Sequence, residues 1–419
     1  MHRIQNYTAL ARTPARRDAL DIIEAGLAAI DTATIVRSTI TYRGSILTVG
    51  AHSWDLRTFR RVHAIGFGKA SCAAAAELER ILGDRLNHGI ALGTEHRVCQ
   101  TIDICEASHP LPSERNVELT ERLVRQCEGV SSDDLVIVIV SGGGSAMLAW
   151  PMSEYAQGVR LYEAANRAGL TIEELNTVRK HISGLKGGGL AKLLYPATVI
   201  GIVFSDIPGD APALVASGPT YPDHTTVADA QAIIDRHRLG SFDLRETPKE
   251  PRYFEHVTNI VLASNTVSLD AMAAHARTLG YTAQVIGNDF TGSAQELIHM
   301  MRQRSEPHSV VLVGGEARLV IASGGGIGGR NQHVALTAAT MLADGQAFAA
   351  IASDGRDNGD TAGALVDDST LERATSCGFS PDTMLQQFNE QPLLAGTGDL
   401  VFTGPTGSNV SDLYILLVP

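Results

Sequence analysis

Short apolar runs alternate along the chain with segments in which apolar residues recur every three or four positions. The second pattern predicts an amphipathic helix over Pro14–Ile30, an alanine-rich helix that ends at Leu82, and a helical stretch over Glu173–Leu194 that its glycines interrupt. The first pattern predicts strands at Val62–Phe67, Leu135–Val140 and Thr198–Phe204. The run after Asp134 is mostly β-branched, which is typical of a strand buried on both faces of a parallel sheet.

The same alternation continues after a charged segment with two prolines, Arg238–Arg252, which predicts a linker. Helices are expected at Val267–Leu279 and Val334–Leu342. Strands are expected at Asn259–Ala263, Thr282–Ile286, Val310–Val313, Arg318–Ala322, Phe348–Ala352, Leu400–Thr403 and Leu413–Val418. Strands that alternate with helices favour mostly parallel sheets. We therefore predict an α/β protein with a larger Rossmann-like, parallel-sheet N-terminal domain over residues 1–240 and a smaller α/β C-terminal domain over 253–419.

Composition narrows the range of partners. The net charge of −12 over 419 residues argues against binding to a nucleic-acid backbone, while local cations can still hold a small anion. The five cysteines form no C-x-x-C pair, which favours reduced thiols in the cytoplasm. The N-terminus has no apolar leader and no apolar run is long enough to span a bilayer, so we expect no membrane partner. The oligomeric state stays open, a homo-oligomer included.

Glycine-rich turns follow two of the predicted strands, where ligands bind in parallel sheets. One turn consists of Ser141, Gly142, Gly143, Gly144 and Ser145. Glycines allow backbone N–H groups to approach an anion closely, so this turn is a candidate phosphate cradle, and a tight strand-to-helix turn is the alternative. Lys69 stands at the second turn, where it could pair with a phosphate or be an ordinary solvated lysine.

Cations and carboxylates supply further candidates. Arg179, Lys180 and Lys186 gather beside Gly187 and Gly188, which indicates a carboxylate or phosphate site, although a basic helix face explains the same pattern. Carboxylates lie at or just after strand ends at Asp206, Asp210, Asp354, Asp357 and Asp360. They could bind Mg²⁺ or accept a hydroxyl proton, but turn and helix-cap roles are favoured for most of them, with Asp206 and Asp354 as the exceptions.

The cluster Gly324–Gly329 satisfies G-x-G-x-x-G before a predicted helix. Asp354 follows too late to be the acidic partner that a dinucleotide site requires. Arg330 and Asn331 on that helix suit phosphate or metal-bound nucleotide contacts instead. An NAD(P)-dependent reductase acting on hydroxypyruvate-like substrates remains the alternative enzyme, and a sugar-acid sensor the non-enzymatic alternative.

Taken in order, these segments resemble the class II glycerate 2-kinase family, whose C-terminal portion is the MOFRL domain. The matching stretches are Gly66–Ser71, His109–Pro112, Ser141–Leu148, Asn176–Ala191, Ser205–Asp210, Ala216–Asp223, Gly314–Glu316, Gly328–Ala335 and Thr406–Leu413. The resemblance implies ATP- and Mg²⁺-dependent phosphorylation of the 2-hydroxyl of D-glycerate, in a cleft between two α/β domains. It makes Lys69 and Arg330 the catalytic cations.

The resemblance and the pattern together complete the expected site. Asp206 is expected to act in catalysis, and Asp206 or Asp354 to bind the metal. Asn331 and Asn409, the latter in the Thr406–Leu413 match, are expected to bind substrate or phosphate. Family members usually carry an Asp-Gly-x-Asp-Gly-x-Thr-Asp-like segment, and this chain departs from it with Asp-Gly-Arg-Asp-Asn-Gly-Asp-Thr over Asp354–Thr361.

Overall fold

The computed structural model describes residues 2–207, 209, 211–321 and 324–419. The chain forms two compact units, which are described separately. The N-terminal unit comprises Ile35–Ser205 and Ala211–Leu262, and the C-terminal unit comprises Met1–Thr34, Asp206–Asp210 and Ala263–Pro419.

The N-terminal unit is built on a six-stranded sheet with the order β6-β5-β4-β7-β8-β9. The strands are β4 (Arg61–Phe67), β5 (His88–Gly93), β6 (Ile102–Glu106), β7 (Asp134–Ser141), β8 (Thr198–Phe204) and β9 (Val257–Ala263). All registered pairs from β6 to β8 are parallel. Every residue of β7 is buried, as its apolar run predicts. A separate antiparallel meander consists of β1 (Ile40–Arg43), β2 (Ile46–Val49) and β3 (His52–Asp55).

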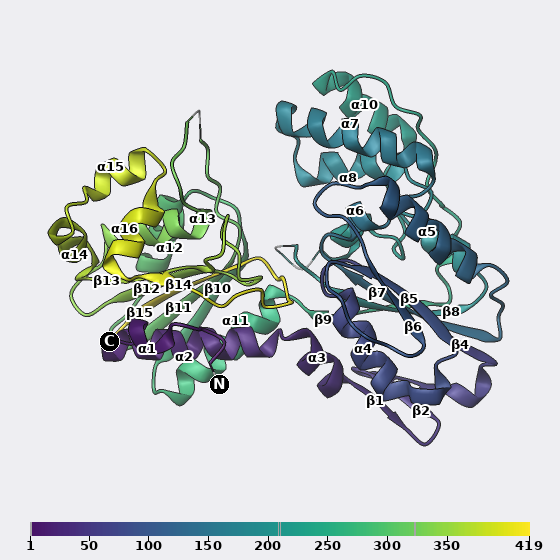
Figure 1. Ribbon diagram of the computed structural model, residues 1–419, viewed down its shortest axis with the longest axis horizontal. Helices are drawn as coiled ribbons and strands as arrows, with labels where there is room; N and C mark the ends of the chain where they lie inside the picture. Colours follow the sequence, from purple (N-terminus) through teal and green to yellow (C-terminus); the bar gives the residue numbers. More distant parts are fainter. Residues whose placement is uncertain (1, 208, 210, 322–323) are drawn as a thin grey trace. The chain divides into compact units, whose positions relative to one another are not determined.

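The helices of this unit pack partly on the sheet and partly on one another (Figure 1). They are α3 (Thr32–Thr39), α4 (Ser71–Leu82), α5 (Glu114–Cys127), α6 (Gly144–Met147), α7 (Met152–Ala168), α8 (Ile172–His181), α9 (Gly189–Leu194) and α10 (Val227–His237), with short 3-10 helices at Leu56–Thr58, Gly83–Arg85, Pro212–Ser217 and Pro251–Tyr253. Side-chain caps fix the residue at which some of these helices begin. Ser113 accepts the Asn116 N–H before α5, and Thr171 forms a reciprocal capping box with Glu174 before α8.

The C-terminal unit contains a second six-stranded sheet with the order β10-β11-β15-β12-β13-β14. Its strands are β10 (Thr282–Phe290), β11 (Ser309–Gly315), β12 (Ala347–Ala352), β13 (Gly363–Asp367), β14 (Leu400–Val401) and β15 (Asp412–Val418). Only β10 and β11 pair in parallel among these described strands, so the expectation of a mostly parallel sheet is wrong here. The reason is that β15 returns from the end of the chain and inserts between β11 and β12, antiparallel to both.

Two helix layers sandwich this second sheet (Figure 1). The first layer packs α2 (Pro14–Ala29) against α11 (Asn265–Thr278), with α1 (Tyr7–Leu10) beside α2. The other layer is formed by α12 (Ala294–Gln303), α13 (Arg330–Ala339), α14 (Thr370–Ser376), α15 (Pro381–Gln386) and α16 (Glu390–Thr397). Its core joins apolar residues of these helices to one face of the strands, for example Leu297 and Val334 to Phe348.

The division into units differs from the predicted domains 1–240 and 253–419. Helix α2 lies in the C-terminal unit because Arg16, fully buried, pairs with Asp367 (2.9 Å) and Asp399 (3.0 Å). The segment Arg238–Arg252 contains no strand or α-helix, but it packs within the N-terminal unit. The Arg245 N–H donates to the His181 carbonyl, and the Thr247 hydroxyl donates to the Asp223 carboxylate. The chain instead changes unit after Thr34, on either side of 206–210, and finally after Leu262 at the end of β9.

Most predicted elements are confirmed. Helices α2, α4, α11 and α13 and strands β4, β7 to β12, β14 and β15 all form near the expected positions, and Ile182–Gly188 separates α8 from α9. The strand predicted over Arg318–Ala322 is wrong for residues 318–321, which have no regular structure because no neighbouring strand pairs with them. Ala322 lies outside the described residues.

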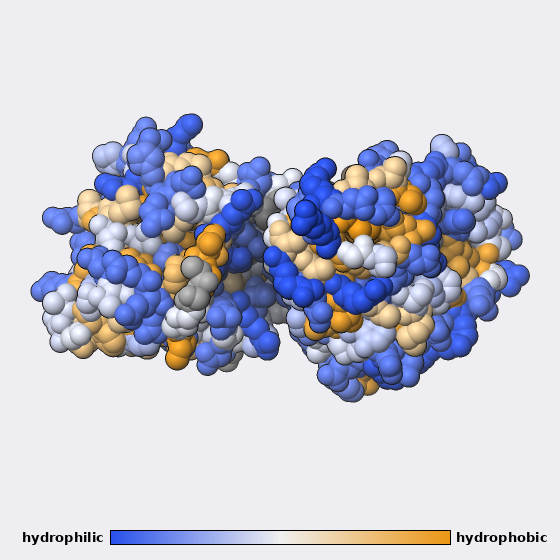
Figure 2. Space-filling model, turned by 90° about the horizontal axis from the view of Figure 1, so that it is seen from above, coloured by the Kyte–Doolittle hydropathy of each residue, from blue (hydrophilic) through white to orange (hydrophobic). Residues whose placement is uncertain are grey.

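No helix among the described residues is both long and apolar enough to cross a bilayer. Figure 2 shows a face on which apolar residues are scattered among hydrophilic ones. All five cysteines are free, as predicted from their spacing.

Candidate functional site

The strand order of the N-terminal sheet reverses between β4 and β7, because the chain moves outward from β4 to β6 and then returns to β7 before running to β9. Ligands of open α/β sheets bind at such a point, outside the carboxyl ends of the strands. Two turns leave the sheet there: Gly68-Lys69-Ala70 after β4, and Gly142-Gly143-Gly144 after β7. Both were predicted from the sequence.

Hydrogen bonds join the two turns. The Lys69 N–H donates to the Gly142 carbonyl (2.9 Å), and the Ala70 N–H to the Ser141 hydroxyl (3.1 Å). Gly68 has a φ of 113°, and a Cβ there would lie 2.3 Å from Ser141 Oγ, so only glycine permits this approach. Ser141 is therefore buried and supports the turn, whereas the prediction made it a ligand contact.

The triglycine turn has unused backbone donors. Among the described residues, no acceptor is found for the N–H groups of Gly143, Gly144 and Ser145. Gly143 adopts a left-handed φ of 81°, and a Cβ there would lie 3.0 Å from His109 Nε2 and 3.4 Å from Lys69 Cγ. The turn therefore lies against Lys69 and His109, and consecutive free N–H groups beside a lysine form a cradle suited to a phosphate.

A chain of polar side chains supports Ser145. Its hydroxyl lies 2.9 Å from that of Ser217, which donates to Asn176 Oδ1 (2.8 Å), and Arg179 Nη1 donates to the same oxygen (3.1 Å). Ser217 adopts a left-handed φ of 62°, a strained conformation for a residue with a side chain. Burial lowers the pKa of Arg179 to about 10, while Glu154 opposes the shift. Arg179 thus reaches the predicted site through this relay.

The other predicted cations are engaged elsewhere in the same unit. Lys186 is fully buried, donates to the Leu148 carbonyl (2.6 Å) and forms a short ion pair with Glu154. Burial lowers its pKa, and Glu154 opposes that shift. Lys180 pairs with the buried Asp223 (3.1 Å). The ammonium groups of Lys186 and Lys180 are therefore directed at protein carboxylates rather than at a ligand.

The glycines after Lys186 are likewise used internally. The Gly187 N–H donates to the Ser217 carbonyl and the Gly188 N–H to the Gly218 carbonyl, each at 2.9 Å. Both have left-handed φ values of 54° and 87°. Instead of forming a second phosphate loop, they hold the segment that carries Ser217.

In the C-terminal unit, Arg330 opens α13 between two carboxylates. Its Nε lies 2.6 Å from Asp412 Oδ2 and its Nη1 3.2 Å from Glu316 Oε2. Burial lowers the pKa of Arg330, but Asp412 and Glu316 outweigh it, so the pKa is raised. Burial raises the pKa of Asp412 to about 6, although Arg330 opposes this, and the Tyr414 hydroxyl donates to the same oxygen (3.2 Å).

The N-terminus of α13 already holds an anion. The buried Asp357 carboxylate accepts the N–H groups of Asn331 and Gln332, both at 2.9 Å. A Cβ at Gly329 would lie 2.2 Å from the Asp357 carbonyl oxygen. No strand precedes this helix among the described residues 316–321 and 324–329. The G-x-G-x-x-G match therefore has neither the strand nor the open helix N-terminus of a dinucleotide site, and the role of Asp357 as a cap is confirmed.

Asp206, Asp354 and Asn409 lie around the edge where β12 ends and β15 begins. The Asp206 carbonyl accepts the Ser411 hydroxyl (2.8 Å), Asp354 Oδ1 accepts the Arg356 N–H (2.9 Å), and Asn409 Oδ1 accepts the Ser411 N–H (3.3 Å). No group of three or more His, Cys, Asp or Glu side chains that could hold a metal ion is found in the described part of the chain. Asp210 lies outside it.

The departure from the family's Asp-Gly-x-Asp-Gly-x-Thr-Asp segment has a local explanation. Asn358, which replaces the second glycine, has a φ of 58°. Asparagine tolerates this left-handed conformation better than other residues with a side chain. Asn358 therefore fits the turn that the Asp357 N–H closes by donating to the Thr361 carbonyl (2.6 Å).

Sequence reasoning missed Ser217, Asn176, Glu316 and Asp412 as site residues. Asp412 is 82 positions from Arg330, and only the insertion of β15 beside β11 brings them together. The position of Ser217 in the stretch Ala216–Asp223 was a signal, but the hydroxyl relay to Ser145 depends on tertiary structure.

Comparison with known proteins agrees with this arrangement. A family model described as "Domain of unknown function (DUF4147)" matches residues 18–246, and one described as "MOFRL family" matches residues 309–412. The "Glycerate 2-kinase" of Pyrococcus horikoshii is 32% identical, covering 85% of this chain and 87% of that protein. A "Putative hydroxypyruvate reductase" of Agrobacterium vitis is 35% identical, covering 85% of this chain and 87% of that protein.

Among solved structures, a glycerate kinase from Thermotoga maritima superimposes with a TM-score of 0.84 at 29% identity, covering 96% of this chain and 99% of that chain. The fold and the two family models place the chain in a class of two-unit α/β proteins with a C-terminal MOFRL domain. The chain belongs to the glycerate 2-kinase family with a MOFRL domain, which confirms the resemblance found in the sequence.

Proposed function

We propose that this protein is an ATP-dependent kinase that phosphorylates D-glycerate on its 2-hydroxyl group. One observation carries the proposal: a triglycine turn with free N–H groups lies against Lys69 at the switch point of a parallel sheet. A cradle of this kind suits a polyphosphate. The kinase names of the Pyrococcus and Thermotoga relatives support the choice of reaction and substrate.

In the proposed reaction, the 2-hydroxyl oxygen bonds to the γ-phosphorus while the bond to the bridging oxygen of ADP breaks. Such transfer depends on positioning and on positive charge near the phosphoryl oxygens. The N–H groups of Gly143, Gly144 and Ser145 would hold phosphate oxygens, and Lys69 would offset charge that develops in the transition state. Arg330 would supply a second positive charge, held in orientation by Asp412.

A divalent cation fits the remaining residues. Asp206 and Asp354 offer oxygen ligands, which Mg²⁺ prefers, and a site with few protein carboxylates is typical of Mg²⁺ bound with substrate phosphates. One of these two residues would hold the ion, which when bound neutralises charge on the phosphates. The carboxylate that is not used as a ligand would accept the hydroxyl proton. The expectation that all these residues act in one cleft between domains stays a prediction, as do a cytoplasmic location and a homo-oligomer.

The test is an ADP-release assay over three- and four-carbon hydroxy acids, with NMR of the product to locate the phosphate. Lys69→Ala is expected to lower kcat by about 10²–10³ or more, because it removes a preorganised charge at the phosphoryl group. Lys192→Ala, which removes an exposed lysine of α9 in the same unit, is the matched control and should leave turnover unchanged. Near-normal kcat for a folded Lys69→Ala protein would remove Lys69 from the mechanism.

The second candidate is an NAD(P)-dependent reductase acting on hydroxypyruvate, supported by the names of two Agrobacterium vitis relatives, each 35% identical. Against it stands the capped N-terminus of α13, where Asp357 occupies the position that a pyrophosphate would need. The same preparation distinguishes the two reactions. NADH oxidation by hydroxypyruvate without ADP release from ATP and glycerate would favour the reductase.

A further inference from the structure

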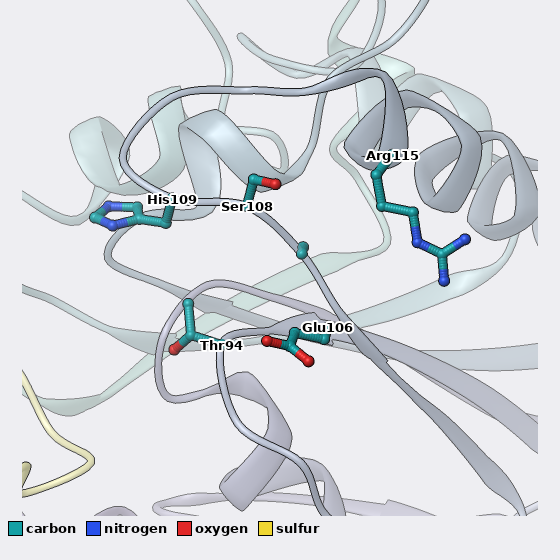
Figure 3. A pocket seen from close by; sticks show the side chains of 6 residues that line it. Thr94, Glu106, Ser108, His109 and Arg115 are labelled. Atoms are coloured by element: carbon teal, nitrogen blue, oxygen red, sulfur yellow. The ribbon is translucent and has the colours of Figure 1, made fainter.

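A polar hollow of about 600 Å³ lies in the N-terminal unit, beside the triglycine turn. It is lined by Thr94, Glu106, Ala107, Ser108, His109 and Arg115. Figure 3 shows Thr94 and Glu106 on the side formed by the sheet, with Ser108, His109 and Arg115 across from them. Thr94 follows β5 directly and Glu106 ends β6, so the hollow opens at the same edge of the sheet as the phosphate cradle.

His109 connects the hollow to the cradle. It lines the hollow, and its Nε2 also lies 3.0 Å from the position of a Cβ at Gly143. The distance between the ends of β4 and β6 follows from the sheet, because β6 lies two places from β4. Neighbouring strands are about 4.8 Å apart, so the ends of β4 and β6 are separated by roughly 10 Å. That is the span of a triphosphate chain and exceeds the length of a three-carbon acid.

We infer that this hollow binds the ribose and base of the nucleotide whose phosphates occupy the triglycine turn. The inference rests on the proposed kinase function and adds the location of the nucleoside. Glu106 ends a parallel strand on one side of the switch point, where a carboxylate can accept hydrogen bonds from vicinal ribose hydroxyls. Arg115 offers a planar guanidinium group, mostly exposed, that can stack on a purine ring.

The lining disfavours the hydroxy acid as occupant. The Glu106 carboxylate would repel the carboxylate of glycerate, and Arg115 alone would have to offset both. The volume lies within the range of sites for nucleoside-sized ligands, and a three-carbon acid would leave most of it filled with water. The acceptor must also lie next to the transferring phosphorus, whereas Glu106 stands at the end of β6, two strands away from the turn after β4.

The experiment compares ATP, 2′-deoxy-ATP and 3′-deoxy-ATP in the ADP-release assay with D-glycerate, for the wild-type protein, Glu106→Gln and Glu118→Gln. Because a hydrogen bond to a charged group is lost, the wild-type kcat/KM should fall about tenfold or more for at least one deoxynucleotide. Glu106→Gln should raise the KM for ATP by a similar factor, treat the three nucleotides alike and keep the wild-type KM for glycerate. Glu118→Gln removes the carboxylate 3.5 Å from Arg115 outside the lining and should behave as wild type.

Two outcomes would overturn the inference. Wild-type discrimination retained in Glu106→Gln would exclude contact with the ribose, and a raised KM for glycerate alone would place the hydroxy acid in the hollow. If no hydroxy acid supports ADP release, the kinase proposal fails separately. Calorimetric titration of ADP and its 2′- and 3′-deoxy forms into the same three proteins then tests the nucleoside site. The wild type and Glu118→Gln should bind at least one deoxynucleotide more weakly than ADP, and Glu106→Gln should bind all three alike. Absence of ADP binding to the wild type would reject the site.

Discussion

At the scale of single residues, the ionisation of Asp412 controls the orientation of the Arg330 guanidinium group. The carboxyl group is buried and its pKa is raised to about 6, with Arg330 at 2.6 Å as the opposing influence. Above pH 6 the carboxylate is ionised and holds the guanidinium group. We expect kcat/KM to fall as the pH drops through about 6, because protonated Asp412 no longer fixes Arg330. A pH–rate profile measures this limb, and Asp412→Asn should lower activity and remove it.

The effect of Asp412 protonation on stability distinguishes the expected loss of activity from acid unfolding. The pKa of Asp412 in the folded protein lies above the ordinary value for an aspartate, so protonating this group favours the folded state. Loss of activity near pH 6 should therefore occur without a loss of stability from Asp412. An unfolding transition that coincides with the activity loss between pH 7 and 5.5 would contradict the interpretation.

Single residues also show how far the sequence could be interpreted. Lys69 and the triglycine turn were identified because a strand, a turn and a helix are contiguous in the chain. The use of Gly187, Gly188 and Lys186 was misjudged, because their partners Ser217, Gly218 and Glu154 lie about 30 positions away. Composition of a loop indicates what it can bind, whereas tertiary contacts decide whether its donors remain free.

At the scale of elements, the first turn of α13 depends on Asp357. Its carboxylate accepts the N–H groups of Asn331 and Gln332 from outside the helix. Asp357→Ala should lower the free energy of unfolding by about 0.5–2 kcal/mol, the usual loss when a cap is removed. It should also lower kcat/KM, because Arg330 is the first residue of this helix.

Urea denaturation and steady-state kinetics measure the two effects. Asp360→Ala is the matched control, since Asp360 is exposed and lies three residues further along the same turn. Gly329→Ala should reproduce the defect, because its Cβ would displace Asp357. Equal stability of the Asp357 and Asp360 variants would show that the cap contributes little.

Helices and strands were predicted well where the hydrophobic pattern alone identifies them. They were predicted less well where pairing with a neighbouring strand determines whether a strand forms. Strand β7 follows from its apolar run alone. The run at Arg318–Ala322 has the same composition as a strand, yet residues 318–321 find no neighbour to pair with, and Val320 is 82% exposed. The antiparallel second sheet could not be predicted either, because the position of β15 depends on a return of the chain from its far end.

At the scale of the whole molecule, the first helices of the chain belong to its last part. Arg16 on α2 is fully buried between Asp367 and Asp399, and Asn6 donates to the Leu400 carbonyl (2.8 Å). Arg373 shares both carboxylates, so the site is a charge network. The N-terminal segment is therefore a structural part of the unit that carries Arg330, and no boundary based on sequence order could have assigned it there.

Arg16→Met tests this assignment. Removing Arg16 takes one buried cation from Asp367 and Asp399, which keep only more exposed arginine partners, and should destabilise the C-terminal unit by up to about 3–5 kcal/mol. Both tryptophans, Trp54 and Trp150, lie in the N-terminal unit, so tryptophan fluorescence reports that unit while far-UV circular dichroism reports both. In urea, the variant should lose part of its circular dichroism at lower denaturant concentration than the wild type, with the fluorescence transition less affected. Fluorescence that shifts as far as the circular dichroism would mean that Arg16 stabilises the whole chain rather than its own unit.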